Sequence, residues 1–292
     1  MNEWQSAVTG VVLVTQAEGL CTQVGAEHRR GHTAVQFASL FAPGLAGVEV
    51  IQGARQLPVT SLETLRIHCW DGHNSRLVAR LDLPIRGMEL HPEGLLVAQT
   101  GGWSLVDWDG KEHPRQDLLG SRLLALATHP SGALWACAKT AGGCLIGELS
   151  AEGELRHGWA VPEQVSAFSW DVSGRSVYAL ASGSGNILML NTGSTNVRRL
   201  SSLPRGGGRL GGLAVDHAGG VWTTQLDGWS LAHFDAHGNL DRMVGLPVPT
   251  PTDLCIGGVD GKTLYITSAR HSLQLEALAS APNAGCLLQM QL

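Results

Sequence analysis

The titratable side chains most suited to chemistry recur at regular intervals along this chain. His91, His129, Asp171 and Asp216 each end a short apolar run and precede a glycine by three residues. With Gly258 as a fifth member of the series, the successive steps are 38, 42, 45 and 42 residues. Histidine and aspartate are proton carriers and metal ligands in enzymes, but they also open tight turns by bonding to the turn backbone. The regular repeat favours the turn role.

The repeated phrase is strand, turn, strand, and it is clearest at 211–230. A weaker first copy lies at 48–61, and each later unit adds two more strands, as at Leu65–Trp70 and Arg76–Leu81. A sustained period of about 40–45 residues with four short strands is typical of a propeller blade. The sequence therefore predicts an all-β fold, a six-bladed β-propeller closed by pairing of N- and C-terminal strands.

The domain organisation follows from the same repeat. Residues 1–32 precede it and are interpreted as an N-terminal extension, and residues 33–292 as one propeller domain. Closure of a propeller removes exposed sheet edges. We expect Thr33–Ala38 to complete the blade that contains Gly285–Leu292, with Val8–Thr15 as the competing strand.

Composition excludes several classes of partner. The net charge is −5 and the three lysines are isolated, so no basic patch for nucleic acid or a membrane surface is expected. The six cysteines show no CxxC spacing, which argues against a zinc site. The apolar run Val11–Val14 is too short for a signal peptide or a membrane span, and a cytoplasmic location is expected.

The C-terminal third carries a more specific pattern. It reads GGLAVD from Gly211 to Asp216, LPVPTPT from Leu246 to Thr252, and TLYITSAR from Thr263 to Arg270. In these phrases the chain resembles the senescence marker protein/gluconolactonase family, the six-bladed propellers that include regucalcin and sugar lactonases. The resemblance implies a divalent metal in the central channel, held by a Glu, two Asn and an Asp, and a lactone substrate.

At the positions that the resemblance assigns to the metal ligands, this sequence has other residues. They are Ala46, Leu124, Ser166 and Gly211, none of which supplies a carboxylate. Calcium and magnesium need about six oxygen ligands, largely carboxylate. The sequence thus predicts that the metal site is lost and that there is no cofactor. The alternative is a Ca, Mg, Mn or Zn site built by Glu49, Glu89 or Asp253, each interpreted as near the start of an inner strand.

Four further residues are candidates to line the central channel that the propeller fold predicts. Arg122 matches a family arginine that faces the substrate, and would favour an anionic or carbonyl-bearing ligand; a solvated ion pair between blades is the alternative. Trp103 and Trp229 each follow a glycine and begin a third strand. Their rings would either offer stacking surfaces to a ligand or pack between blades. His271 follows the family signature and would lie near the channel mouth.

Two functional hypotheses result. The first is a lactonase-family propeller without its metal that binds a small molecule in the central channel, either without catalysis or with metal-independent chemistry. The alternative is a metal-dependent lactone or ester hydrolase with displaced ligands. The ligand-binding candidates are Arg122, Leu124, Ser166, Gly211, Trp103, Trp229, His271 and Asp253. Catalytic residues, the ligand and the oligomeric state are left open by the sequence.

Overall fold

The computed structural model describes most of the chain from residue 65 onward and several segments before it. The described residues are 11–16, 20–25, 27–29, 32–34, 48–50, 65–70, 75–83, 85–91, 93–99, 101–118, 121–203, 206, 208–257, 261–269, 279–285 and 287–292. No helix among them is long and apolar enough to cross a membrane.

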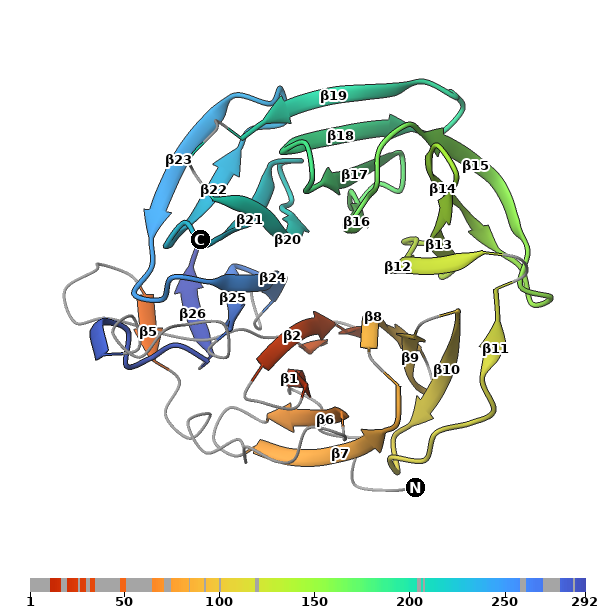
Figure 1. Cartoon of the computed structure of the whole chain (residues 1–292), viewed down its shortest axis with the longest axis horizontal. Coiled ribbons are helices and arrows are strands. Elements are labelled where there is room, and N and C mark those ends of the chain that lie inside the picture. Colours follow the sequence, from red (N-terminus) through yellow and green to blue (C-terminus); the bar gives the residue numbers. More distant parts are fainter. Residues whose placement is uncertain are drawn as a thin grey trace.

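The described strands form a β-propeller (Figure 1). Six four-stranded antiparallel sheets, here called blades one to six, surround a central axis. From the axis outward, the first three blades are β2(Leu20–Gly25)–β1(Val11–Gln16)–β6(Leu65–Trp70)–β7(Ser75–Leu81), β8(Ile85–His91)–β9(Gly94–Gln99)–β10(Gly102–Asp107)–β11(Gln116–Asp117), and β12(Arg122–Thr128)–β13(Leu134–Thr140)–β14(Gly143–Leu149)–β15(Leu155–Val161).

The other three blades follow the same order. They are β16(Ala167–Trp170)–β17(Ser176–Ala181)–β18(Asn186–Asn191)–β19(Val197–Ser202), β20(Arg209–Val215)–β21(Val221–Leu226)–β22(Ser230–Phe234)–β23(Leu240–Gly245), and β24(Pro251–Gly257)–β25(Thr263–Ser268)–β26(Leu288–Gln291)–β5(Val48–Val50). The inner strands β2, β8, β12, β16, β20 and β24 therefore line the axis. A separate pair, β3(Glu27–Arg29) and β4(His32–Ala34), forms a two-stranded sheet.

An N-terminal strand does close the propeller, but the predicted strand was wrong. The C-terminal strand β26 pairs with β5, through Leu288–Val50, Gln289–Glu49 and Met290–Val48. The start of the segment Thr33–Ala38 belongs to β4, and residues 35–38 lie outside the described residues. The competing segment, Val8–Thr15, supplies most of β1, which pairs with β6 in blade one. Residues 11–16 and 20–25 are thus strands of blade one, and the prediction that they belong to an N-terminal extension was wrong.

The hydrophobic core of the described residues lies between the blades, where facing sheets pack against one another. The second strands β17 and β25 are buried at every residue, which a strand between two packed sheets requires. Between blades three and four, Trp135, Trp159 and Trp170 pack together, with ring centroids 5.0–6.1 Å apart. Aromatic rings in such contacts add to the stabilisation given by their buried area.

The turns between first and second strands confirm the turn role of the repeated aspartates. Asp216 Oδ1 accepts the N–H groups of Ala218 and Gly220, at 2.9 and 2.8 Å. Gly219 has φ of 79°, in the left-handed region that favours glycine. Asp171 holds the equivalent turn in blade four by accepting the N–H groups of Arg175 and Ser176.

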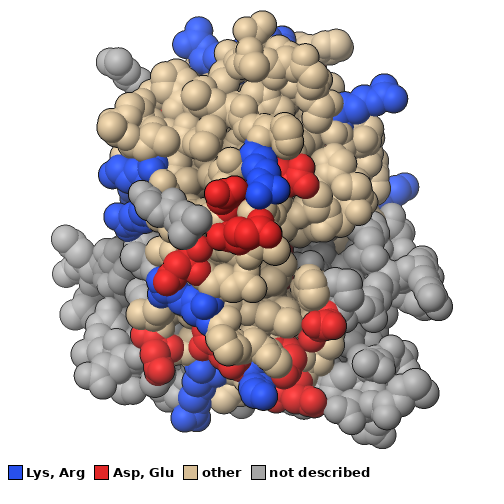
Figure 2. All heavy atoms as spheres, turned by 90° about the vertical axis from the view of Figure 1, so that its right-hand side faces the viewer, with Lys and Arg blue, Asp and Glu red and all other residues tan. Residues whose placement is uncertain are grey.

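Charged side chains are intermixed on the outer surface. On the face seen in Figure 2, acidic and basic residues share one band. Exposed ion pairs in the described part join Arg115 to Asp117 and Arg156 to Glu152 and Glu154. Pairs of this kind contribute little to stability.

Candidate functional site

The inner strands carry irregularities near the end at which they begin. The pairing register shifts between Ile85 and Gly87 in β8 and between Leu123 and Ala125 in β12. It also shifts between Leu210 and Leu213 in β20 and between Pro251 and Leu254 in β24. Bulges of this kind re-aim side chains and are frequent beside binding sites. Four blades thus have a β-bulge near the start of the inner strand.

Three of the predicted site residues lie within these bulges. Leu124 is in the bulge of β12, Gly211 in that of β20 and Asp253 in that of β24. Leu124 is half-buried and packs against the core between blades three and four. Among these three residues, only Asp253 carries a polar side chain.

Asp253 fits against β20 because Gly212 has no side chain. A Cβ placed on Gly212 would overlap Asp253 Oδ1 and would lie 2.7 Å from the backbone nitrogen of Leu254. Oδ1 accepts the N–H of Leu254 at 2.9 Å. Burial raises the pKa of Asp253 to about 7; the hydrogen bond from Leu254 opposes this rise, and the negative charge of Glu89 adds to it. Asp253 is therefore a carboxyl that changes its charge near neutral pH.

Glu89 is the second carboxyl of the site. It lies on β8, is half-buried, and has its pKa raised to about 7 by burial, against interactions with Thr128 that lower it. Its negative charge is also the smallest of the causes that shift the pKa of Asp253. Glu89 was predicted only as a substitute metal ligand, since its raised pKa depends on burial that the sequence does not display.

Gly211 is closely surrounded. A Cβ on Gly211 would overlap Thr224 Oγ1 and lie 2.8 Å from the carbonyl oxygen of Thr252. The Thr224 hydroxyl donates to that carbonyl at 3.2 Å and accepts the N–H of Gly212 at 2.7 Å. In blade six, the N–H of Asp253 donates to Thr267 Oγ1 at 2.9 Å. In both blades, a threonine of the second strand satisfies an N–H that the bulge of the first strand leaves outside the ladder.

Ser166 and Arg122 also lie where inner strands begin. Ser166 precedes β16, and its Oγ donates to the carbonyl of Leu180 at 3.2 Å and lies 2.5 Å from Ser182 Oγ. Ser182 in turn donates to the carbonyl of Leu210 at 2.7 Å, which connects blades four and five. Arg122 is the first residue of β12 and is exposed. No ion pair of Arg122 occurs among the residues that the structure describes.

The structure separates the two tryptophans that the sequence analysis grouped together. Trp103 is 5% exposed on the third strand β10, where it packs with Ala98 and Leu123 between blades two and three. It is a core residue there, on a strand that is not the innermost of its blade. Trp229 is 39% exposed and has a φ of 54° in the turn that precedes β22. Its exposed ring lies outside the core.

The remaining candidates are placed as follows. Glu49 is the middle residue of β5, the outermost strand of blade six, so the interpretation that it begins an inner strand was wrong. Ala46 and His271 lie outside the described residues. Among the described residues, no group of three or more His, Cys, Asp or Glu side chains is arranged to hold a metal ion.

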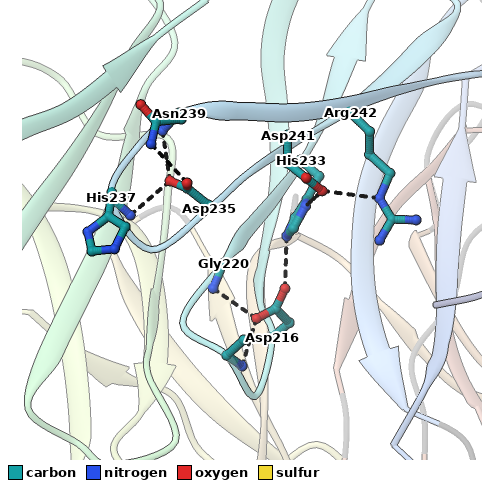
Figure 3. A network of polar contacts seen from close by, with 9 residues as sticks. Asp216, Gly220, His233, Asp235, His237, Asn239, Asp241 and Arg242 are labelled. Carbon is teal, nitrogen blue, oxygen red and sulfur yellow. Dashed lines mark hydrogen bonds and ion pairs between the residues drawn. The ribbon is translucent and has the colours of Figure 1, made fainter.

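A second polar network lies in blade five at the opposite end of β20 (Figure 3). His233 Nε2 is 2.9 Å from Asp216 Oδ2, and Nδ1 is 2.8 Å from Asp241 Oδ2. The ring stacks on Trp222 with centroids 4.4 Å apart, and the Arg242 guanidinium lies 5.1 Å from the Trp222 ring. The network joins the first turn of the blade to its third and fourth strands. Sequence reasoning placed Asp216 in the turn but did not find its partner.

Comparisons with known proteins agree with this architecture. Residues 166–270 match the model of the SMP-30/Gluconolactonase/LRE-like region. The chain is 41% identical over 81 residues to 6-deoxy-6-sulfogluconolactonase of Pseudomonas putida, which covers 28% of either protein. It is 24% identical over 235 residues to pentonolactonase of Haloferax volcanii, covering 74% of this chain and 78% of that enzyme.

A solved structure gives the same fold. The calcium-binding protein regucalcin of Agrobacterium tumefaciens aligns with a TM-score of 0.63 at 19% identity, over 77% of this chain and 82% of that one. At this identity the likeness establishes the fold alone. The strand order and the sequence matches together support the family resemblance seen in the C-terminal third.

Proposed function

We propose that this chain, whose residues 166–270 match the SMP-30/Gluconolactonase/LRE-like region, binds a small carbonyl-bearing molecule in a central channel without the divalent metal that the resemblance implies. The binding site would lie along the inner strands, with Asp253 in the bulge of β24 and Glu89 farther along β8 as its polar groups. The observation that carries the proposal is this pair of half-buried carboxyls, both with pKa near 7.

The protonation of the pair suits a ligand with a carbonyl and hydroxyl groups. When two acids each titrate near pH 7, they hold about one proton between them at that pH. The neutral carboxyl donates a hydrogen bond to a carbonyl oxygen, and the ionised one accepts from a hydroxyl. A sugar lactone offers both groups, and two of the relatives are named as lactonases.

The metal of the relatives does not fit the residues that stand at its place here. An Asp at position 211 would overlap Thr224 Oγ1, and Leu124 carries no oxygen in its side chain. Carboxylates supply most of the affinity for Ca²⁺ and Mg²⁺. Arg122, exposed at the start of β12, instead offers a cation to the carbonyl or to an anionic substituent of the ligand.

A metal-dependent lactone or ester hydrolase with displaced ligands is the second candidate. The observation that favours it is the same carboxyl pair, since Glu89 and Asp253 are oxygen ligands when both are ionised. In that case the metal would hold both carboxyls in their charged form. The two candidates therefore differ in whether ligand binding requires a metal.

The test is calorimetric titration of a freshly dissolved sugar lactone into the protein in EDTA and, separately, in CaCl₂. We expect saturable binding in EDTA, weakened about tenfold by Asp253→Asn or Glu89→Gln, the loss expected when one buried hydrogen bond is removed. Glu93→Gln, which changes an exposed carboxyl on the turn after β8, is the matched control and leaves the affinity unchanged. Binding only in CaCl₂, lost in both variants, would instead establish the metal-dependent candidate.

A further inference from the structure

We infer that the blade-five position of the family's metal ligand is closed in this protein by the Thr224 hydroxyl, so that an aspartate restored at Gly211 alone does not bind a metal. The inference deepens the proposed function, and rests on it for the place of the site. The presence of a glycine at position 211 shows only that the carboxylate is missing. The inference adds that another group, the Thr224 hydroxyl, occupies the space.

The first step is steric. Cβ atoms in real proteins do not come within 3.0 Å of another heavy atom, yet a Cβ on Gly211 would overlap Thr224 Oγ1 and lie 2.8 Å from the Thr252 carbonyl oxygen. One of these neighbours belongs to a buried side chain and the other to the backbone of the adjacent blade. In a close-packed interior, neither moves without cost. Even alanine is too large at this position.

The second step is the hydrogen bonding that holds Thr224 in place. Its side chain is 0% exposed, and its hydroxyl both accepts from Gly212 and donates to Thr252. A hydroxyl that turned away to make room would leave the Gly212 N–H buried without its acceptor. That loss adds to the steric penalty. The hydroxyl is therefore fixed in the orientation that blocks position 211.

The third step is that the same hydroxyl joins two blades without an ion. Gly212 and Thr224 belong to blade five, whereas Thr252 belongs to blade six. Thr252 Oγ1 continues the contact to Thr267 Oγ1 at 2.6 Å, and Thr267 accepts from the Asp253 N–H. The polar groups at the starts of β20 and β24 thus have partners within the protein. A metal placed there would have to displace them.

The experiment compares Gly211→Asp, Gly211→Ala and Gly211→Asp/Thr224→Ala by thermal melting in EDTA and in titrations with Ca²⁺, Mg²⁺, Mn²⁺ and Zn²⁺. Overpacking of a core commonly lowers the melting temperature of a domain this size by about 5 °C. We expect both single variants to lose this much, and Gly211→Asp to gain no metal-dependent rise. The double variant, relieved of the Thr224 hydroxyl, is expected to melt above Gly211→Asp. Wild-type melting of Gly211→Asp in EDTA, with a saturable rise on adding metal, would overturn the inference.

A second pair of variants serves if the Gly211 variants do not fold. Thr224→Ser keeps the hydroxyl and is expected to melt within about 2 °C of the wild type, whereas Thr224→Val has the same shape without it and melts several degrees lower. Equal melting of the two would overturn the role given to the hydroxyl. The wild-type metal titration separates the two proposals. A saturable rise that Asp253→Asn abolishes would sink the metal-free function and leave the closure at Gly211 standing.

Discussion

The carboxyls of the turns and the carboxyls of the inner strands behave in opposite ways. At the turn of blade four, burial alone would raise the pKa of Asp171, but hydrogen bonds from the Ser173 hydroxyl and from turn N–H groups outweigh it and hold the pKa below its usual value. Burial without enough compensation raises the pKa of Glu89 and Asp253 to about 7. The same chemical group is thus stabilised in its ionised form in one region and in its neutral form in the other.

The opposite pKa shifts of the two groups of carboxyls indicate different roles, one in stability and one in binding or chemistry. A turn aspartate has its lone pairs satisfied by the backbone and stabilises the fold when it is charged. The inner-strand carboxyls cost stability when they are charged, and strongly perturbed acids of this kind are candidates for binding or proton transfer. The repeated aspartates that stand out in the sequence are therefore the less promising ones for chemistry.

The largest loss in free energy of unfolding is expected for Asp216→Ala, which removes both the contact with His233 and the hydrogen bonds that hold the turn. Leaving a buried polar group without its hydrogen-bond partner typically costs about 1–3 kcal/mol. Asp216 and His233 are only 17% and 11% exposed in their side chains, and loss of the turn hydrogen bonds adds to this cost. Urea denaturation measures the loss, with Asp109→Ala on an exposed turn as the control. A loss below about 1 kcal/mol would mean that the contact in Figure 3 adds little.

A change of the opposite sign is expected for Glu89→Gln and Asp253→Asn. Because their folded pKa values lie above the unfolded ones, the folded state holds more protons, and wild-type stability falls as pH rises from about 4 to about 7. Each neutral variant removes part of this fall. Its free energy of unfolding should exceed that of the wild type by about 2 kcal/mol at pH 8 and should be close to the wild-type value at pH 4. Denaturant unfolding at both pH values measures it. Parallel curves for variant and wild type would contradict the raised pKa values.

The smallest effect is expected for Asp171→Ala. Its lowered pKa gives stability that is present above the unfolded value of 3.8 and is lost as pH falls through the lower folded value. We expect a cost of about 1 kcal/mol at pH 7, which shrinks below pH 3. Asp171→Asn keeps one acceptor oxygen and should lose less. A cost that stays constant down to pH 2 would show that the carboxylate charge plays no part.

Local patterns predicted much of the fold. The strand Leu65–Trp70 was predicted with the bounds that the structure gives, and Arg76–Leu81 differs from β7 by one residue, because a run between turn residues specifies its own ends. The turns at Asp171 and Asp216 were predicted for the same reason. The candidate site was predicted less completely. Asp253 was singled out, whereas Glu89 was named only among substitute metal ligands.

The sequence by itself determined the repeat, the blade and the family resemblance, since each depends on residues close together in the chain. Tertiary structure decided which strand closes the ring, because β5 and β26 are joined by pairing over more than two hundred residues that no local pattern encodes. It also decided that Trp103 is core, that Thr224 stands against Gly211, and that Glu89 and Asp253 hold protons near pH 7. These properties depend on close approach and on exclusion of water, which exist only once the blades have packed together.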